Sequence, residues 1–197
     1  STSTTFFIND GKLYGMGTNT SGQMGNANTS TKVTAPTQIG SFSNVSNVAI
    51  SSDTTFFIDD GKLYGTGRNG SYQQGNGTTT NVTAPTQIGS YSNVTKVAVS
   101  TGTTVFIDDG KLYGMGSNAN GQLGTGATST VKTPAEIGSF TTAIDVAVSA
   151  ATTMFLIGPS SATVTITTND ATYGTVSNGS VTADIGTEIS ATGNTLT

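Results

Sequence analysis

The 197-residue sequence contains no cysteine, no histidine and no tryptophan. Without cysteine and histidine the chain has no thiolate nucleophile, no imidazole base, no disulfide and no zinc site built from Cys or His. These absences exclude most of the catalytic arrangements that enzymes commonly use. We therefore predict a protein that is not an enzyme, with no catalytic residues and no metal ligands.

Charged residues are also few, at 9% of the chain, and acidic residues outnumber basic ones to give a net charge of −4. Nucleic acid and anionic membranes attract basic surfaces, so we expect neither as a partner. No apolar run approaches the ~20 residues that span a bilayer, and we expect no membrane insertion. The Gly15-Met16-Gly17 segment is not followed by a helix that could receive a phosphate, and we predict no cofactor.

One segment recurs along the chain at an almost constant spacing. Residues 4–15 read TTFFINDGKLYG, and the pattern returns with few changes at 54–65 and 103–114. A partial copy follows, so that copies begin near residues 4, 54, 103 and 152. Such self-similarity is typical of repeat architectures, in which each unit packs against its neighbours.

Each copy contains four short segments typical of β-strands. The apolar runs Phe6-Phe7-Ile8 and Leu13-Tyr14 flank Asp10-Gly11, where glycine provides the positive φ of a hairpin turn. A third strand is expected at 36–39 and a fourth at 47–51, with counterparts in the later copies. Large residues on both faces of the first strand predict a sheet that is covered on both sides. Four strands in about 49 residues are typical of a β-propeller blade.

The segments that follow the hairpins carry a family resemblance. Residues 13–25 and 112–124 read LYGMGTNTSGQMG and LYGMGSNANGQLG. They resemble the regulator of chromosome condensation repeat, in which a strand ending Trp-Gly-x-Asn precedes x-x-Gly-Gln-Leu-Gly. Met16, Thr66 and Met115 stand at the family's Trp position, and Tyr72 stands where glycine is expected. The resemblance covers residues 1–157 and implies a propeller.

The pattern stops near Gly158. Strand-like segments follow at 162–167, 173–176, 180–183 and 188–191, and they resemble small β-repeats of bacterial surface proteins. We predict an all-β fold: a partial β-propeller of about three four-stranded blades over 1–157, and a small, incomplete β-repeat over 158–197. Because both ends stop within the pattern, we expect the terminal part of a longer propeller; the alternative is that several chains associate to cover the exposed blade faces.

The adjacent acids Asp59-Asp60 and Asp108-Asp109 admit two interpretations. They could form a calcium site or a general acid/base pair. Asp also stabilises turns through its own backbone, and Asn9 replaces the first acid in the first copy. We favour the turn interpretation.

The recurring Asn-x-x-Gly-Gln-x-Gly loop is the candidate binding site. Its side-chain amides could bind sugar hydroxyls or a protein backbone, or they could tie the loop to its own main chain. We favour the second reading, and Tyr72 is an aromatic that could contact a ligand. The candidate ligand-contact residues are Asn19, Gln23, Asn69, Tyr72, Gln73, Asn118 and Gln122.

These features predict a non-enzymatic extracellular repeat module of a bacterial surface protein or a phage virion. Its role would be structural or adhesive, at the cell or virion surface, and its partner a protein or glycan surface ligand or other copies within its own assembly. The alternative is a secreted propeller that inhibits an enzyme. The exchange-factor and chromatin-binding role that the resemblance implies ranks last, since Arg68 is the one arginine.

Overall fold

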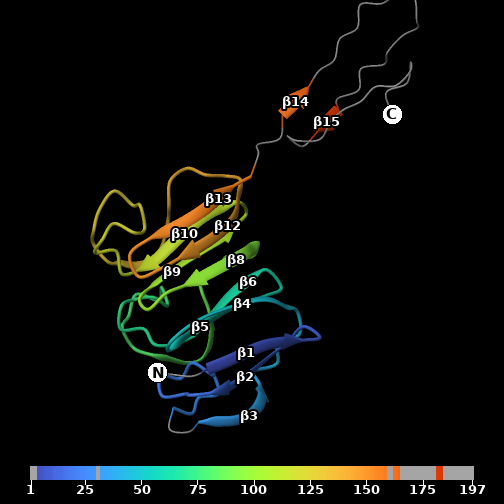
Figure 1. The fold of residues 1–197 in the computed structure, drawn as a ribbon, viewed down its shortest axis with the longest axis vertical. Helices are drawn as coiled ribbons and strands as arrows, with labels where there is room; N and C mark the ends of the chain where they lie inside the picture. The colour runs from blue at the N-terminus through green and yellow to red at the C-terminus, as the bar shows by residue number, and fades with distance from the viewer. Residues whose placement is uncertain (1–3, 30–31, 159–161, 165–180, 184–197) are drawn as a thin grey trace, which may run out of the picture. The chain divides into compact units, whose positions relative to one another are not determined.

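The computed structural model describes residues 4–29, 32–158, 162–164 and 181–183 (Figure 1). This part of the chain consists of β-strands and connecting turns, without a helix. Accordingly, it offers no helix long and apolar enough to cross a membrane. The chain divides into two compact units, Ser1–Ile157 and Gly158–Thr197.

Three hairpins form where the sequence predicts them. They pair β1 (Thr4–Asn9) with β2 (Lys12–Gly17), β5 (Thr54–Asp59) with β6 (Lys62–Gly67), and β9 (Thr103–Asp108) with β10 (Lys111–Gly116). In the first turn Asp10 has a φ of 50° and Gly11 a φ of 69°. Positive φ at both central residues defines the turn that matches the twist of a hairpin, and Asp-Gly is a favoured pair for it.

Each complete sheet draws on two successive sequence repeats. The two complete sheets have the orders β4-β5-β6-β7 and β8-β9-β10-β11. The first sheet, β1-β2-β3, lacks an inner strand, and the last, β12-β13, lacks its two outer strands. The remaining strands are β3 (Val33–Gln38), β4 (Val45–Ser51), β7 (Val82–Gln87), β8 (Val94–Val99), β11 (Val131–Glu136), β12 (Ala143–Val148) and β13 (Thr153–Ile157).

The predicted bounds of the outer strands were wrong. They were expected to start at the prolines, but each of β3, β7 and β11 begins three residues earlier, so that Pro36 lies within β3. These strands lie at sheet edges, where one side of the backbone pairs with no strand, and the register shifts beside them between Gly15 and Gly17. Proline is compatible with a strand at such an edge or bulge.

The hydrophobic core lies between neighbouring sheets. Phe56 and Ile58 point to one face of β5 and join a cluster with Phe106 and Met115 of the next hairpin. Phe57 points to the other face and joins Leu13, Met24, Ile39 and Val45. Large residues on both faces of the strand are therefore both buried, as the sequence predicts. A third cluster continues the pattern between β9–β11 and β12.

In the second unit, β14 (Ala162–Val164) pairs antiparallel with β15 (Val181–Ala183). Both fall within strands that the sequence predicts. The strands expected at 173–176 and 188–191 lie outside the described residues.

Candidate functional site: the amide loops and an open pocket

The asparagine of each candidate loop closes that loop. Its Oδ1 accepts a hydrogen bond from the backbone amide five residues later: Met24 N at 2.9 Å for Asn19, Gln74 N at 2.9 Å for Asn69, and Leu123 N at 2.8 Å for Asn118. Its Nδ2 donates further along the chain, for example from Asn69 to the Thr78 carbonyl at 2.8 Å. One side chain thus fixes both ends of a loop that has few other backbone partners.

The glutamine of each loop makes a second, tighter turn. Oε1 of Gln73 accepts from Ser71 N at 2.8 Å, and Gln23 and Gln122 accept equivalent bonds. Gln73 Nε2 also donates to the Thr101 carbonyl at 3.3 Å, in the turn that begins the next hairpin. The loop is therefore joined to the following sheet as well as to itself.

The six candidate amides are buried. Relative exposures are 1% for Asn19 and Gln23, 0% for Asn69, Gln73 and Asn118, and 7% for Gln122. Contact of these residues with a ligand stays a prediction. Their burial and their bonds within the loop favour the alternative, in which the amides hold the loop in place.

Tyr72 differs from the other six candidates because it is only partly buried. Its φ of 63° lies in the left-handed region, where glycine is usual. Its ring lies 5.4 Å from the ammonium of Lys132 on the outer strand of the next sheet. At the equivalent position, a Cβ on Gly22 would lie 2.9 Å from the Thr83 Cα. In the first loop Gly22 packs closely against Thr83, whereas in the second loop the Tyr72 ring lies near the ammonium of Lys132.

Two hydroxyl bonds between sheets were missed by sequence reasoning. Thr66 Oγ1 donates to the Gly22 carbonyl at 2.8 Å, and Thr104 Oγ1 donates to the Gln73 carbonyl at 3.0 Å. Both hydroxyls are buried. The available signal for Thr104 was a threonine that repeats at positions 5 and 55, whereas Thr66 replaces the methionine of the other copies. The loops thus form joints between sheets.

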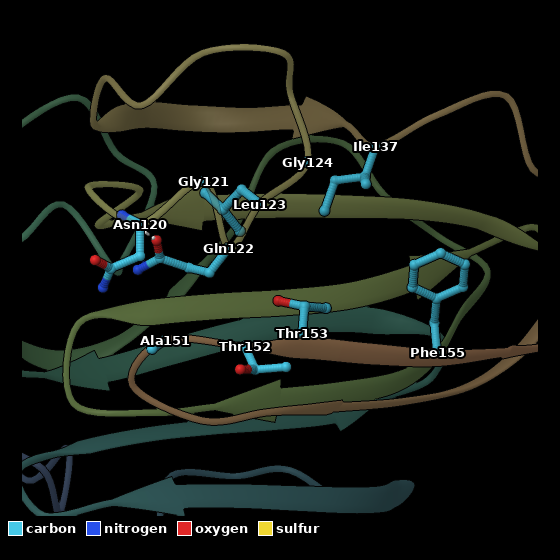
Figure 2. A pocket seen from close by; sticks show the side chains of 10 residues that line it. All are labelled: Asn120, Gly121, Gln122, Leu123, Gly124, Ile137, Ala151, Thr152, Thr153 and Phe155. Atoms are coloured by element: carbon cyan, nitrogen blue, oxygen red, sulfur yellow. Dashed lines mark hydrogen bonds between the residues drawn. The ribbon is translucent and has the colours of Figure 1, made fainter.

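A pocket of about 300 Å³ lies beside the third loop (Figure 2). It is lined by loop residues 120–124, Ile137, residues 151–153 and Phe155, none of which is titratable. Figure 2 shows the Ile137 and Phe155 side chains on one side of the space and the Asn120 and Gln122 amides on the other. The pocket is thus amphipathic, with an apolar end and a polar end.

The corresponding space beside the first two loops is filled by the next sheet. A Cβ on Gly25 would lie 2.8 Å from Pro85, and one on Gly75 would lie 2.2 Å from Met115 Sδ and 3.1 Å from Pro134. A Cβ on Gly124 would meet only Ile137, at 3.5 Å. The pocket is therefore the place where the outer strands of a further sheet would lie.

The adjacent acids accept hydrogen bonds from backbone amides and form the hairpin turns of the repeat. Asp59 Oδ1 accepts from Asn44 N at 2.9 Å, and Asp108 Oδ1 accepts from Asn93 N at 2.9 Å. The second acids, Asp60 and Asp109, have φ values of 51° and 50° in their turns. No group of three or more acids gathers in the described residues. This geometry supports the turn interpretation over the calcium or acid/base interpretation.

Comparison with known proteins identifies the repeats of this chain. The family model of the regulator of chromosome condensation (RCC1) repeat matches residues 10–58, 60–107 and 109–156. No curated protein matches the sequence.

Solved structures share the fold. Human WBSCR16 is 23% identical with a TM-score of 0.69, over 79% of this chain and 43% of that one. Prp20p from Saccharomyces cerevisiae, studied for its binding to Gsp1p and histones, is 22% identical with a TM-score of 0.64, over 73% and 39%. Yeast RCC1 bound to Kap60 is 21% identical, with a TM-score of 0.64, over 76% and 39%. The chain therefore adopts blades of the RCC1 β-propeller and spans less than half the length of these relatives.

Proposed function

The chain belongs to the regulator of chromosome condensation (RCC1) repeat family, and from this premise we propose that it is a binding module rather than a catalyst. Specifically, we propose a non-enzymatic extracellular module of a bacterial surface or phage virion protein, with a structural or adhesive role. Its ligand would be a glycan or a protein exposed on another surface.

The observation that carries this proposal is a polar edge repeated on successive sheets. The outer strands β3, β7 and β11 each leave one edge unpaired. Thr37 and Gln38 are exposed on the first of these edges, and Thr86 and Gln87 on the second. Their amides and hydroxyls donate to backbone carbonyls two residues away, but unlike the loop amides they are exposed. They are neutral hydrogen-bonding groups of the kind that recognise sugars and peptide backbones.

Repetition makes weak contacts useful. A ligand that itself repeats can engage the edges of β3 and β7 at once, and linked weak contacts raise the overall affinity by orders of magnitude. In Figure 1 the three candidate loops also project from the same side of the stacked sheets. This array suits a periodic surface better than a small soluble substrate.

The low charge of the chain favours a binding module over the exchange-factor and chromatin-binding role. The chain has seven basic residues in all, and Arg68, its one arginine, lies 3.9 Å from Asp53. A surface so poor in charge suits binding that depends little on salt. It offers little for the exchange-factor and chromatin-binding role. An inhibitor of an enzyme would need a cluster of aromatic or charged residues to anchor it. Tyr72 and Lys132 form one such aromatic and charged pair, which is smaller than a cluster.

The test is binding of the labelled 197-residue protein to arrayed oligosaccharides and to intact bacterial cells. We expect saturable binding that changes little with salt. Gln38→Ala and Gln87→Ala should each weaken it, and the double variant should weaken it by about the product of the two effects. Gln23→Ala serves as a control for loss of fold, since Gln23 is buried. Absence of binding to every surface, or equal binding by wild type and double variant, would contradict the proposal.

A further inference from the structure

The two end sheets of unit 1 lack complementary strands. The first sheet, β1-β2-β3, has a free edge on β1 where β5 and β9 pair with an inner strand. The last sheet, β12-β13, has a free edge on β13 where β5 and β9 pair with β6 and β10. Each end contains what the other lacks, because β12 is an inner strand and β2 and β3 are outer strands.

The two end sheets also each contain only part of the set of aromatic rings found in a complete sheet. Each complete sheet contains three rings in mutual contact, such as Tyr91, Phe106 and Tyr113, with centroids 4.8 to 5.3 Å apart. The first sheet has the pair Phe7 and Tyr14 alone, at 5.3 Å. The last has Phe140 and Phe155, at 4.9 Å, without a tyrosine. Phe140 together with Phe7 and Tyr14 would make one complete set.

Exposed side chains distinguish both end strands from their counterparts. Phe7 is 37% exposed, whereas its counterparts Phe57 and Phe106 are fully buried. On β13, Met154 is 70% and Leu156 is 57% exposed, so little burial is lost when another strand replaces β13. Burial of apolar side chains such as Phe7 is the main driving force for association.

We propose that a second copy of the chain completes the end sheets by strand exchange. β1 of one copy pairs with β12 of the other in place of β13, and β2 and β3 follow it into the position of the missing outer strands. Met16 and Pro36 then enter the pocket beside Gly124, as Met115 and Pro134 do beside Gly75.

The exchange replaces one strand by a similar one. β1 reads TTFFIN, and residues 152–157 read TTMFLI. Residues of β13 take no part in the three core clusters of the described residues, whereas Phe6 of β1 packs against one of them. β1 is thus the better anchored of the two strands. Exchange of like elements is an inexpensive route to a dimer.

Two copies are enough to close a ring. Each copy contributes two complete sheets, and the two shared sheets bring the total to six, within the range of four to eight blades known for propellers. The chain spans 43% of WBSCR16 and 39% of Prp20p, so that two copies approach the length of one complete propeller.

Cysteine pairs test this pairing directly, because the chain has no native cysteine. Val99 pairs with Thr104 between β8 and β9, so the exchanged blade should place Val148 opposite Thr5 of the other copy. Within one copy, Val148 pairs with Thr153. In Figure 1 β1 and β12 lie in sheets at opposite ends of unit 1, so a Thr5–Val148 bond within one copy is excluded. The two pairs therefore report different arrangements.

We expect Thr5→Cys/Val148→Cys to oxidise to a covalent dimer, seen by non-reducing electrophoresis, and Val148→Cys/Thr153→Cys to remain reduced. In sedimentation, the wild type should have twice the 19.8 kDa mass of the chain. Met16→Asp should give a folded monomer, since Met16 is only partly buried in one copy and would be enclosed in the dimer. Ile144→Asp is the matched control: Ile144 is 50% exposed and its counterparts Ser46 and Thr95 are exposed within complete sheets, so this variant should stay dimeric.

Three outcomes would overturn the proposal: a wild-type monomer, an open-ended ladder of assemblies, or oxidation of the Val148–Thr153 pair without a Thr5–Val148 dimer. A monomer would leave the ends for other repeats to cover. None of these results bears on surface binding, so this proposal and the proposed function can fail separately.

Discussion

The same short sequence is buried in the middle of unit 1 and exposed at its ends. Phe57 and Ile58 of β5 are fully buried between two sheets, while Phe7 and Ile8 of β1 are 37% and 36% exposed. The hairpins that carry them have the same strand pairing and the same turn. Their difference lies in the neighbours alone, so the stability of a repeat resides largely in its interfaces.

The largest expected effect comes from truncating one phenylalanine in each environment. Phe57→Ala should reduce the free energy of unfolding by about 3–5 kcal/mol, because it leaves a cavity in a closed cluster. In the monomeric Met16→Asp background, Phe7→Ala should cost about 1 kcal/mol or less, since the side chain already meets water in a single copy. Urea denaturation followed by tyrosine fluorescence measures both. In the wild-type background Phe7→Ala should cost more than in the monomer, because the proposed dimer covers this end; an equally small loss in both backgrounds would contradict the dimer.

Gly75 and Gly124 occupy equivalent positions in two loops, so they test the same difference between the middle and the end of unit 1. Gly75→Ala should cost about 2–3 kcal/mol, because the new methyl group adds a clash with Met115 and Pro134 to the strain of a positive φ. Gly124→Ala has a similar φ and, in the monomeric Met16→Asp background, open space, so there it should cost about 1 kcal/mol. Thermal unfolding of the two variants gives the difference. In the wild-type background Gly124→Ala should be about as costly as Gly75→Ala, because the proposed dimer fills the pocket beside Gly124; a small cost there would contradict the dimer.

The acids at the hairpins should give a smaller effect. Asp59→Ala should cost about 1 kcal/mol, because the Asn44 amide loses its acceptor. Asn9→Ala should cost less, because Asn9 makes no equivalent side-chain bond within the described residues. The melting temperature of the wild type should not change with chelator. A fall of several degrees on chelation would instead favour the calcium interpretation.

The smallest effect is expected at alkaline pH. Burial, followed by the neighbouring Tyr113, Asp108 and Glu136, raises the pKa of Tyr91 above its ordinary value of 10.0. The folded state therefore holds this proton more tightly than the unfolded state. The resulting stability is fully present below pH 10.0 and is lost as pH rises through the pKa of the folded state.

Phe42 and Phe140 occupy the position of Tyr91 in the other repeats, so Tyr91→Phe makes the three alike. The variant should lose less stability than the wild type between neutral and strongly alkaline pH, measured by urea midpoints. Parallel profiles for the two proteins would show that Tyr91 does not contribute to the pH dependence.

Local signals predicted most of this fold. Asp10-Gly11 fixed the hairpin turn, and the large residues on both faces of β5 predicted a sheet covered on both sides. The start of β3 was misplaced because Pro36 suggests a boundary, whereas an edge strand with a register shift accommodates it. A proline alone does not reveal which side of the strand is free.

The candidate site was predicted in its residues but less well in its geometry. Asn69 and Gln73 could be recognised as loop-closing amides because their spacing places both within one turn. The bond from Thr104 to the Gln73 carbonyl joins residues 31 positions apart, and it arises only when two sheets stack. The pocket beside Gly124 likewise results from the arrangement of neighbouring sheets, which no single repeat encodes.

The strands of each complete blade come from two successive sequence repeats, and this affects how such a chain can lengthen. The inner strand of a sheet and one of its three aromatic rings come from one sequence repeat, and the other strands come from the next. Duplication of any stretch of one repeat length, wherever its boundaries fall, therefore yields one further complete blade with both of its interfaces already compatible. Genetic recombination needs no particular breakpoint to lengthen this protein, provided that the phase of the repeat is kept.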